Sequence, residues 1–342
     1  MLSLNDIETI HVELSTHCNA ACPFCARNDY GYKTRTDFPL ISLTIDQWKR
    51  IFDDVSLPKL KRIAFSGTYG DPFMCKDVEA ITDYCSSKFP ETLLDFSTNG
   101  SMRTNAFWSN FGTKKNVRVR FALDGVTQEV HSLHRIGTSF DEVIHNAKAF
   151  IASGGDAVWL MIQFRHNQHQ VKIAKTLAKK MGFSDFILKE NGKDLGWVYT
   201  NENDGYWILP VEDKNDVKYP PHPGEYKPFV RESYEDFKRQ EAKWINAGRK
   251  VSCSSLNGKS IYIAGDGKVY PCCWLGQYPD TYKFNNFRDV VGDIDNRADV
   301  VGLEQAISWF NKVQESWKRN SIEDGMLMNC VGCAKGHFHQ ET

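Results

Sequence analysis

The sequence predicts an α/β fold, in which six repeated strand–helix units form a parallel sheet and a small cysteine-rich domain follows. Short apolar runs alternate with helix-length amphipathic segments from residue 9 to about residue 188. Turn sequences rich in Gly, Asn, Asp and Pro follow several of these runs. A second group of cysteines starts at Cys253 and continues toward the C terminus. Together these three observations indicate two domains.

The strand candidates are four to eight residues long, the usual length of buried strands. They are residues 9–14, 62–66, 93–97, 117–123, 157–164 and 186–189. The helix candidates between them lie near residues 44–55, 76–87, 104–111, 140–153 and 168–181. Because ligands of open parallel sheets bind beyond the carboxyl ends of the strands, we expect the residues that directly follow each strand to form the site.

Residues 191–250 break the alternation, with five prolines, many aromatic residues and a polar helical stretch. We therefore predict three parts: a strand–helix domain over residues 1–190, a bridging segment over 191–250 and a cysteine-rich domain over 251–342.

Composition excludes some classes of partner. The 342 residues include 42 Lys and Arg against 43 Asp and Glu, so no global field would hold the protein on nucleic acid or on an anionic membrane. The start lacks the basic and apolar regions of a signal peptide, and no apolar run reaches about 18 residues. The sequence predicts a soluble, cytoplasmic protein without a membrane partner and without a nucleic-acid partner.

Three cysteines follow the first strand candidate directly. Cys18, Cys22 and Cys25 have the spacing C-x3-C-x2-C. A cubane iron-sulfur cluster has four irons, so three local thiolates leave one iron open, as three-ligand zinc sites leave an open position in catalytic centres. The alternative is a structural zinc knuckle.

With Phe24 before its last cysteine, the triplet resembles the signature of the radical S-adenosylmethionine (radical SAM) enzymes. The resemblance implies a partial (β/α)6 TIM-type barrel, with which the six repeated units agree. It also implies a [4Fe-4S] cluster whose open iron binds S-adenosylmethionine (SAM). In the family, reductive cleavage of SAM yields a 5′-deoxyadenosyl radical that takes a hydrogen atom from the substrate. An electron donor such as flavodoxin or ferredoxin is expected.

The same resemblance suggests contacts to SAM. Gly70 and Asp71, before a proline, resemble the Gly-rich motif that binds the SAM amine, with Asp in place of the usual Glu. Ser97 and Asn99 follow the third strand candidate, where polar side chains could meet the ribose or the carboxylate. The alternative for both segments is an ordinary turn, because Gly, Asn, Asp and Pro are turn residues.

Residues 123–125 and 131–135 resemble the segment by which the peptide-modifying branch of the superfamily holds the SAM carboxylate. Arg135 is therefore the candidate, since its planar fork suits a carboxylate; a surface salt bridge is the alternative. We expect Gln163, at the end of the fifth strand candidate, to line the adenosine pocket. His131 and His134 are typical of solvent-facing or capping positions, and we assign them no role.

The C-terminal cysteines form a second candidate site. Cys253, Cys272, Cys330 and Cys333 resemble the ligands of a SPASM or twitch extension, which implies one auxiliary [4Fe-4S] cluster and hence two clusters in all. A hairpin with strands at residues 260–264 and 268–270 would bring Cys253 and Cys272 together. A structural zinc site is the alternative, and Cys273 is expected to be a spare.

The predicted function is that of a radical SAM enzyme that carries out a two-electron oxidation, with a small molecule as substrate. Only eight residues precede the first strand candidate, whereas peptide modifiers often carry a leader-binding unit there; a peptide is therefore the second choice. Alternatives of another class are a zinc-stapled binding protein and an electron carrier. No catalytic acid or base can be placed without a substrate.

Overall fold

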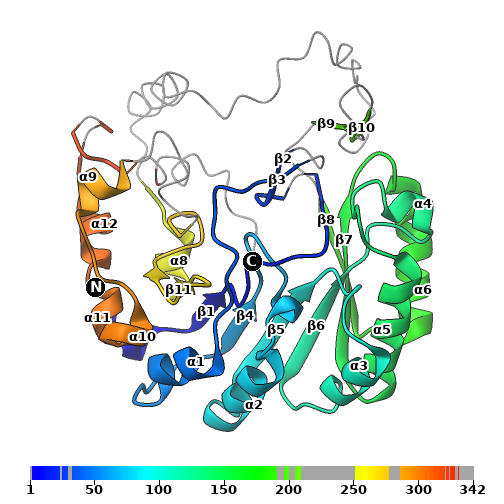
Figure 1. The fold of residues 1–342 in the computed structure, drawn as a ribbon, viewed down its shortest axis with the longest axis horizontal. Helices are drawn as coiled ribbons and strands as arrows, with labels where there is room; N and C mark the ends of the chain where they lie inside the picture. Colours follow the sequence, from blue (N-terminus) through cyan, green and yellow to red (C-terminus); the bar gives the residue numbers. More distant parts are fainter. Residues whose placement is uncertain are drawn as a thin grey trace. The chain divides into compact units, whose positions relative to one another are not determined.

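The structure is a computed structural model (Figure 1). It describes residues 2–23, 25–29, 33–190, 196–199, 205–208, 251–276, 286–319, 321–322, 324–327 and 330. The chain forms two compact units. The first, called the sheet unit, comprises residues 12–45 and 62–220, and the second, called the C-terminal unit, comprises residues 1–11, 46–61 and 221–342.

The sheet unit is built on parallel strands in the order β4-β5-β6-β7-β8. They are β4 (Arg62–Phe65), β5 (Leu93–Thr98), β6 (Val117–Ala122), β7 (Asp156–Gln163) and β8 (Asp185–Glu190). The amide of Ser66 donates to the carbonyl of Val12, so the end of β1 (Thr9–Val12) lies beside β4. Every predicted strand is present, and this mostly parallel α/β sheet confirms the predicted class, in keeping with a partial TIM barrel.

Helices follow the strands as predicted. The main ones are α2 (Val78–Lys88), α3 (Asn105–Phe111), α5 (Phe140–Ala152) and α6 (Val171–Met181), and α6 continues the 3-10 turn η3 (Gln168–Gln170). Side-chain caps fix two of the starts: Thr104 accepts from the amide of Phe107, and Ser139 accepts from the amide of Glu142. These caps satisfy amides that have no partner within the helix.

Short elements complete the sheet unit. They are β2 (Asn28–Asp29), β3 (Lys33–Thr34), η2 (Pro72–Met74), α4 (Gln128–His131), β9 (Gly196–Tyr199) and β10 (Gly205–Ile208). The antiparallel pair β9–β10 lies in the predicted bridging segment, most of which falls outside the described residues.

An aromatic core fixes which face of the sheet the helices cover. Phe96 of β5 contacts Phe111 of α3 with ring centroids 5.4 Å apart, and Phe121 of β6 lies 5.1 Å from Trp108. All four rings are fully buried. Because side chains alternate along a strand, the residues next to Phe96 and Phe121 point to the opposite face. Figure 1 shows α3, α5 and α6 along one side of these strands.

The C-terminal unit contains the predicted hairpin. β11 (Ser260–Ile263) pairs antiparallel with β12 (Val269–Tyr270), and β11 is followed in the sheet by the start of β1. Gly267 closes the turn with φ 82°, a left-handed conformation that glycine adopts without strain. The helices of this unit are η1 (Leu4–Asp6), α1 (Ile45–Phe52, from Asp46 onward), α8 (Ser254–Asn257), α9 (Phe287–Val291), α10 (Ala298–Val301), α11 (Leu303–Ile307) and α12 (Phe310–Ser316).

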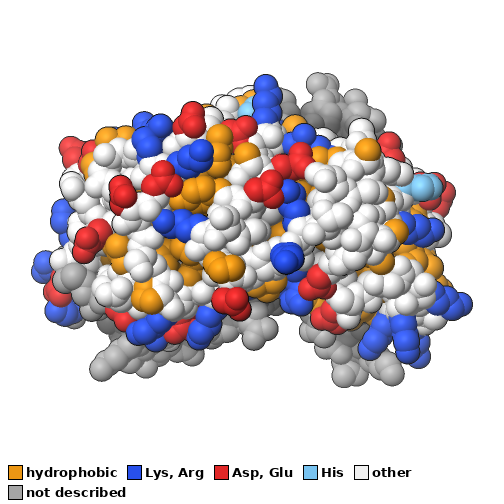
Figure 2. Space-filling view, turned by 90° about the horizontal axis from the view of Figure 1, so that it is seen from below, with side chains coloured by type: hydrophobic (Ala, Val, Ile, Leu, Met, Phe, Trp, Pro, Cys, Tyr) orange, Lys and Arg blue, Asp and Glu red, His pale blue; other side chains and the backbone are white. Residues whose placement is uncertain are grey.

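The surface agrees with the balanced composition. Figure 2 shows acidic and basic side chains interspersed on one face of the molecule, with apolar side chains between them. Among the described residues, no helix has both the length and the apolar character needed to cross a membrane.

Candidate functional site

The three cysteines of the N-terminal triplet lie in one loop after β1, and the loops that follow three neighbouring strands reach them. The Cys25 thiol lies 3.9 Å from the Thr68 carbonyl after β4. Asn99, after β5, has its Nδ2 at 3.7 Å from the Cys18 sulfur, and Arg135, after β6, has its Nη1 at 3.9 Å from the Cys22 sulfur. The site therefore lies at the carboxyl ends of the strands, as the sequence predicts.

The surroundings of the three sulfurs fit a group that binds thiolates. Burial raises the pKa of Cys18 to about 12 and that of Cys25 to about 11, and it also raises the pKa of Cys22. Thiolates here need positive charge or N–H donors close by. The Ala20 amide, 3.4 Å from the Cys18 sulfur, is one such donor, and Asn99 and Arg135 supply two more.

The donor set is not arranged for one ion. In the part of the chain that the structure describes, no three His, Cys, Asp or Glu side chains converge on a single metal position. Each cysteine is nevertheless within electrostatic reach of another of the three. Three soft thiolate ligands are the kind of donor that an iron-sulfur cluster binds.

The loop after β4 packs against the cysteine loop without room for a side chain. A Cβ atom on Gly70 would lie 2.0 Å from the carbonyl oxygen of Ser15. The amides of Tyr69 and Gly70 both donate to Oε1 of Glu13, at 2.6 and 3.1 Å. Glu13 is fully buried and directly follows β1, between this strand and the cysteines. The buried carboxylate thus ties the two loops together.

Asp71, predicted to meet the SAM amine, uses its carboxylate within the protein. It accepts from the amides of Phe73 (3.0 Å) and Asn99 (2.8 Å), and the Thr98 hydroxyl lies 2.9 Å from both of its oxygens. Burial raises the pKa of Asp71, and the hydrogen bonds offset part of that effect. The side chain joins the loops after β4 and β5.

The other residues predicted to contact SAM differ in their burial and in their hydrogen bonds. Asn99 is held by Asn19, whose Oδ1 accepts from its Nδ2 at 2.8 Å, and by the Ser101 amide, which donates to its Oδ1. Ser97 and Gln163 lie near the ends of β5 and β7, both half-buried. Phe24 lies outside the described residues.

A buried network holds Arg135. Asp124 Oδ2 accepts from Arg135 Nε at 2.5 Å and lies 2.7 Å from Nδ1 of His134, while its Oδ1 accepts from the Ile162 amide at 2.7 Å. Burial alone would raise the pKa of Asp124, but the Arg135 charge and the His134 hydrogen bond hold it well below its usual range. An ionised carboxylate therefore fixes the guanidinium beside Cys22.

Comparison with known families identifies the segment that carries this geometry. Residues 12–178 match the sequence model of the Radical SAM superfamily. These residues are similar to the radical SAM domain. They include the cysteine triplet, the loops after β4 and β5, and the Asp124 network, so the observed convergence lies wholly within the matched segment. A search of curated proteins finds no match.

Solved structures similar to this chain include proteins with bound S-adenosylmethionine. SuiB from Streptococcus suis bound to S-adenosylmethionine has a TM-score of 0.52 and 15% identity, over 86% of this chain and 67% of that chain. SuiB bound to the precursor peptide SuiA has a TM-score of 0.53 and 14% identity, over 97% and 76%. A histidine-tagged form of anSMEcpe with bound AdoMet has a TM-score of 0.50 and 15% identity, over 91% and 80%. At these identities the likeness shows the fold.

The C-terminal unit brings its own cysteines together. Burial raises the pKa of Cys272 strongly, and the charges of Cys273, Cys330 and Cys253 raise it further. These three residues therefore lie within electrostatic reach of Cys272. Cys333 falls outside the described residues, so its place in the set stays a prediction.

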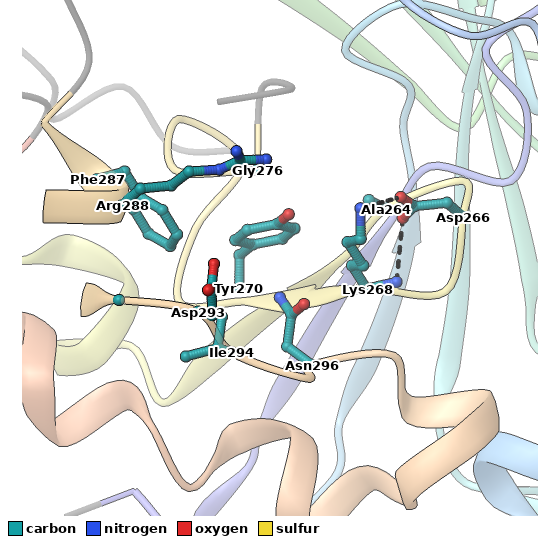
Figure 3. A pocket seen from close by; sticks show the side chains of 11 residues that line it. Ala264, Asp266, Lys268, Tyr270, Gly276, Phe287, Arg288, Asp293, Ile294 and Asn296 are labelled. Carbon is teal, nitrogen blue, oxygen red and sulfur yellow. Dashed lines mark hydrogen bonds and ion pairs between the residues drawn. The ribbon is translucent and has the colours of Figure 1, made fainter. Parts of the chain in front are cut away.

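A small cavity of about 130 Å³ lies in the C-terminal unit (Figure 3). Tyr270, Phe287, Arg288 and Asn296 line it, and Lys268 at its edge forms an ion pair with Asp266. Cavities that bury a ligand of drug size have roughly 300–1,000 Å³. This cavity is therefore too small for SAM.

Sequence reasoning missed two parts of the site. Glu13 lies in an apolar strand pattern, and only its unusual position as a charged residue within a predicted buried strand could have marked it. His131 and His134 were expected at solvent-facing or capping positions and were assigned no role; the structure contradicts a solvent-facing position, because both are buried. The His131 ring meets the Thr138 hydroxyl at 2.9 Å, and His134 joins the Asp124 network.

Proposed function

We propose that this chain is a radical SAM enzyme that oxidises its substrate by two electrons. The observation that carries the proposal is the convergence of Asn99 and Arg135, from the ends of two neighbouring strands, on the sulfurs of Cys18 and Cys22. Cys18, Cys22 and Cys25 would hold a [4Fe-4S] cluster with one open iron. When bound there, the cluster and SAM supply a 5′-deoxyadenosyl radical, which abstracts a hydrogen atom.

The residues of the domain would bind and orient SAM. Arg135 donates through Nε to Asp124 and through Nη1 toward Cys22, and no hydrogen bond among the described residues uses its Nη2. That donor suits the SAM carboxylate. The backbone of the Gly70 loop would meet the amine, and Asp71 would hold this loop in place. Ser97, Asn99, Gln163 and Phe24 would line the remainder of the SAM site.

The C-terminal cysteines would complete the reaction. We assign Cys253, Cys272, Cys330 and Cys333 to one auxiliary [4Fe-4S] cluster of a twitch or SPASM type. Loss of one electron and one proton from a substrate radical completes a two-electron oxidation, and a closed cluster offers an acceptor for that electron. Electrons for SAM cleavage would come from a donor such as flavodoxin or ferredoxin.

A small molecule is the proposed substrate, and a peptide is the second candidate. What favours a peptide is the likeness to SuiB, whose structure was solved with a precursor peptide, at a TM-score of 0.53. The proposed division of the chain remains a barrel over residues 1–190, a bridging segment over 191–250 and an auxiliary domain over 251–342.

The test is the iron and sulfide content of the protein reconstituted without oxygen, followed by an assay for 5′-deoxyadenosine with dithionite and SAM. About eight irons per chain and 5′-deoxyadenosine are expected. A Cys22→Ser variant should lose the product, whereas Cys85→Ser, at a fully buried cysteine in α2, should keep it. Zinc in place of iron, or iron without SAM cleavage, would overturn the proposal and favour a metal-stapled binding or electron-transfer protein.

A further inference from the structure

Charged residues gather on the face of the parallel sheet that points away from α3 and α5. In register, Asp95 of β5 pairs with Arg118 of β6, and Ser97 pairs with Arg120, so these side chains share one face. Their chain neighbours Phe96 and Phe121 pack on the helices. Phe65 of β4 and Phe186 of β8 contact rings on the helix-covered face of the sheet. Arg62 and Lys189 each lie three residues away on the same strands, so their side chains point to the opposite face. We call Arg62, Asp95, Arg118, Arg120 and Lys189 the charged face.

Two arginines of the charged face share one carboxylate. Arg62 Nη2 lies 2.7 Å from Asp95 Oδ2, and Arg120 donates to the same carboxylate through Nε at 2.9 Å and Nη2 at 2.6 Å. Asp95 is almost wholly buried, and the two arginine side chains are only 24% and 16% exposed. One negative charge therefore serves two largely desolvated cations.

Lys189 adds a third cation to the charged face. No ion pair between described residues involves Lys189, and the neighbouring Arg118 is already neutralised by Asp156 at 2.8 Å. Burial lowers the pKa of Lys189, and repulsion from Arg120, Arg62 and Arg135 lowers it further. Lys189 is thus within electrostatic reach of the Arg62–Arg120 pair and of the arginine beside Cys22.

The register of β7 and β8 shows where Lys189 lies relative to the cysteine site. Lys189 pairs with Ile162, and the Ile162 amide donates to Asp124, which holds Arg135. Arg120 lies four residues before Asp124 on the same chain, roughly 13 Å along an extended strand. A small molecule could therefore reach from the charged face to the SAM site.

Among the ion pairs of the described residues, Asp95 serves both Arg62 and Arg120, and none includes the partly buried Lys189. Burial of unpaired charge is costly, and proteins keep it where a ligand neutralises it. We propose that Lys189, with Arg120 and Arg62, binds an anionic group of the substrate, a carboxylate or a phosphate. The assignment of this anion to the substrate rests on the proposed function, whereas binding of the anion itself does not.

The test measures anion binding by the reconstituted holoenzyme at constant ionic strength. Inorganic phosphate and glutarate are the probes, and each is titrated into the protein by calorimetry. The probe that binds with the lower Kd shows whether the site prefers a phosphate or a carboxylate. Lys189→Met should weaken the preferred probe at least about tenfold, and Lys189→Arg should retain binding because it keeps the charge. Lys179→Met, at an exposed position of α6, is the matched control and should change nothing.

A second measurement covers the case in which Lys189→Met fails to fold. In the wild-type holoenzyme, acetylation of Lys189 by acetic anhydride, mapped by mass spectrometry, should slow at least threefold when the preferred probe is present, while acetylation of Lys179 should not. Equal binding by Lys189→Met and wild type, or no protection of Lys189, would overturn the inference. The proposed function fails separately, if wild-type protein forms no 5′-deoxyadenosine.

Discussion

Asp124 and Arg135 form a buried ion pair, with 2.5 Å between Oδ2 and Nε, and the same guanidinium lies 3.9 Å from the sulfur of Cys22. The carboxylate is completely buried, so its charge is weakly screened and acts strongly on its partner. His134 and the Ile162 amide hold the remaining lone pairs of Asp124. The orientation of Arg135 at the cysteine site is therefore set by a residue that does not itself reach the sulfurs.

Replacing Asp124 by Asn should slow SAM cleavage more than a substitution at an exposed ion pair does. The neutral amide removes the charge that fixes Arg135, and loss of such supporting partners lowers activity about 10–100-fold. The rate of 5′-deoxyadenosine formation and the KM for SAM measure the effect, and we expect KM to rise. Asp83→Asn, which breaks an exposed pair with Lys114, is the control. Equal activity of the two variants would contradict the positioning role.

Replacing Asp71 by Asn tests whether this residue holds the loop or only meets SAM. The amide nitrogen would face donors from Thr98 and Asn99, so a buried polar group would lose its partner, at a cost of about 1–3 kcal/mol. We expect the free energy of unfolding to fall by that amount in urea, measured without SAM. A variant that is as stable as wild type without SAM, but binds SAM weakly, would assign Asp71 to SAM contact alone.

The sequence was sufficient for the strands and helices because their signals are periodic. Each predicted strand matches an observed one within a few residues; residues 93–97, for example, correspond to Leu93–Thr98. The cysteine loop was also predictable, because the three cysteines lie close together in the sequence and therefore in one loop. In contrast, α1 belongs largely to the C-terminal unit, where Gln47 donates to Asp299 at 3.3 Å. A contact between residues 252 positions apart leaves no local pattern.

Charged and polar residues of the site were harder to place for a related reason. Asp71 and Asn99 are turn residues by type, and only the fold shows that the Asn99 amide donates to Asp71 across two loops. His134 could be assigned no role because residue type alone does not show that it is buried against Asp124, ten residues earlier in the chain. Burial and the partners found in the fold, rather than residue type, decide these functions.

Replacing Gly70 by Ala should disturb the cysteine loop. The new Cβ would lie 2.0 Å from the Ser15 carbonyl, and a rigid backbone must move to admit it. We expect a loss of at least about 2 kcal/mol in the free energy of unfolding and less iron at the first site. Gly154→Ala is the comparison: its Cβ meets nothing within 4 Å, so its φ of 93° costs about 1–3 kcal/mol but should leave the iron content unchanged. Equal losses in the two variants would contradict the steric argument.

His131 should make stability depend on pH. Burial lowers its pKa to about 4, below the ordinary value near 6.5, so the unfolded chain binds more protons than the folded protein between these two values. Stability therefore rises with pH across this window, and acidification from pH 7 to 5 should cost about 1–2 kcal/mol at this residue. The measurement is the free energy of unfolding in urea, at pH 7 and pH 5, for the wild-type apoprotein and for His131→Gln. His145→Gln, at an exposed position of α5, is the control. An unchanged pH slope in His131→Gln would argue against this source.

The C-terminal cysteines can be separated by two adjacent substitutions. Cys272 lies within electrostatic reach of Cys253, Cys273 and Cys330, whereas Cys273 was predicted to be a spare. Cys272→Ser should reduce the iron content from about eight to about four per chain, because a closed cube needs four thiolates. Cys273→Ser should keep about eight. Since both changes remove one thiol from the same turn, a difference between them reports ligation rather than folding. The reverse outcome would make Cys273 the ligand and direct the Cys272 side chain away from the cluster.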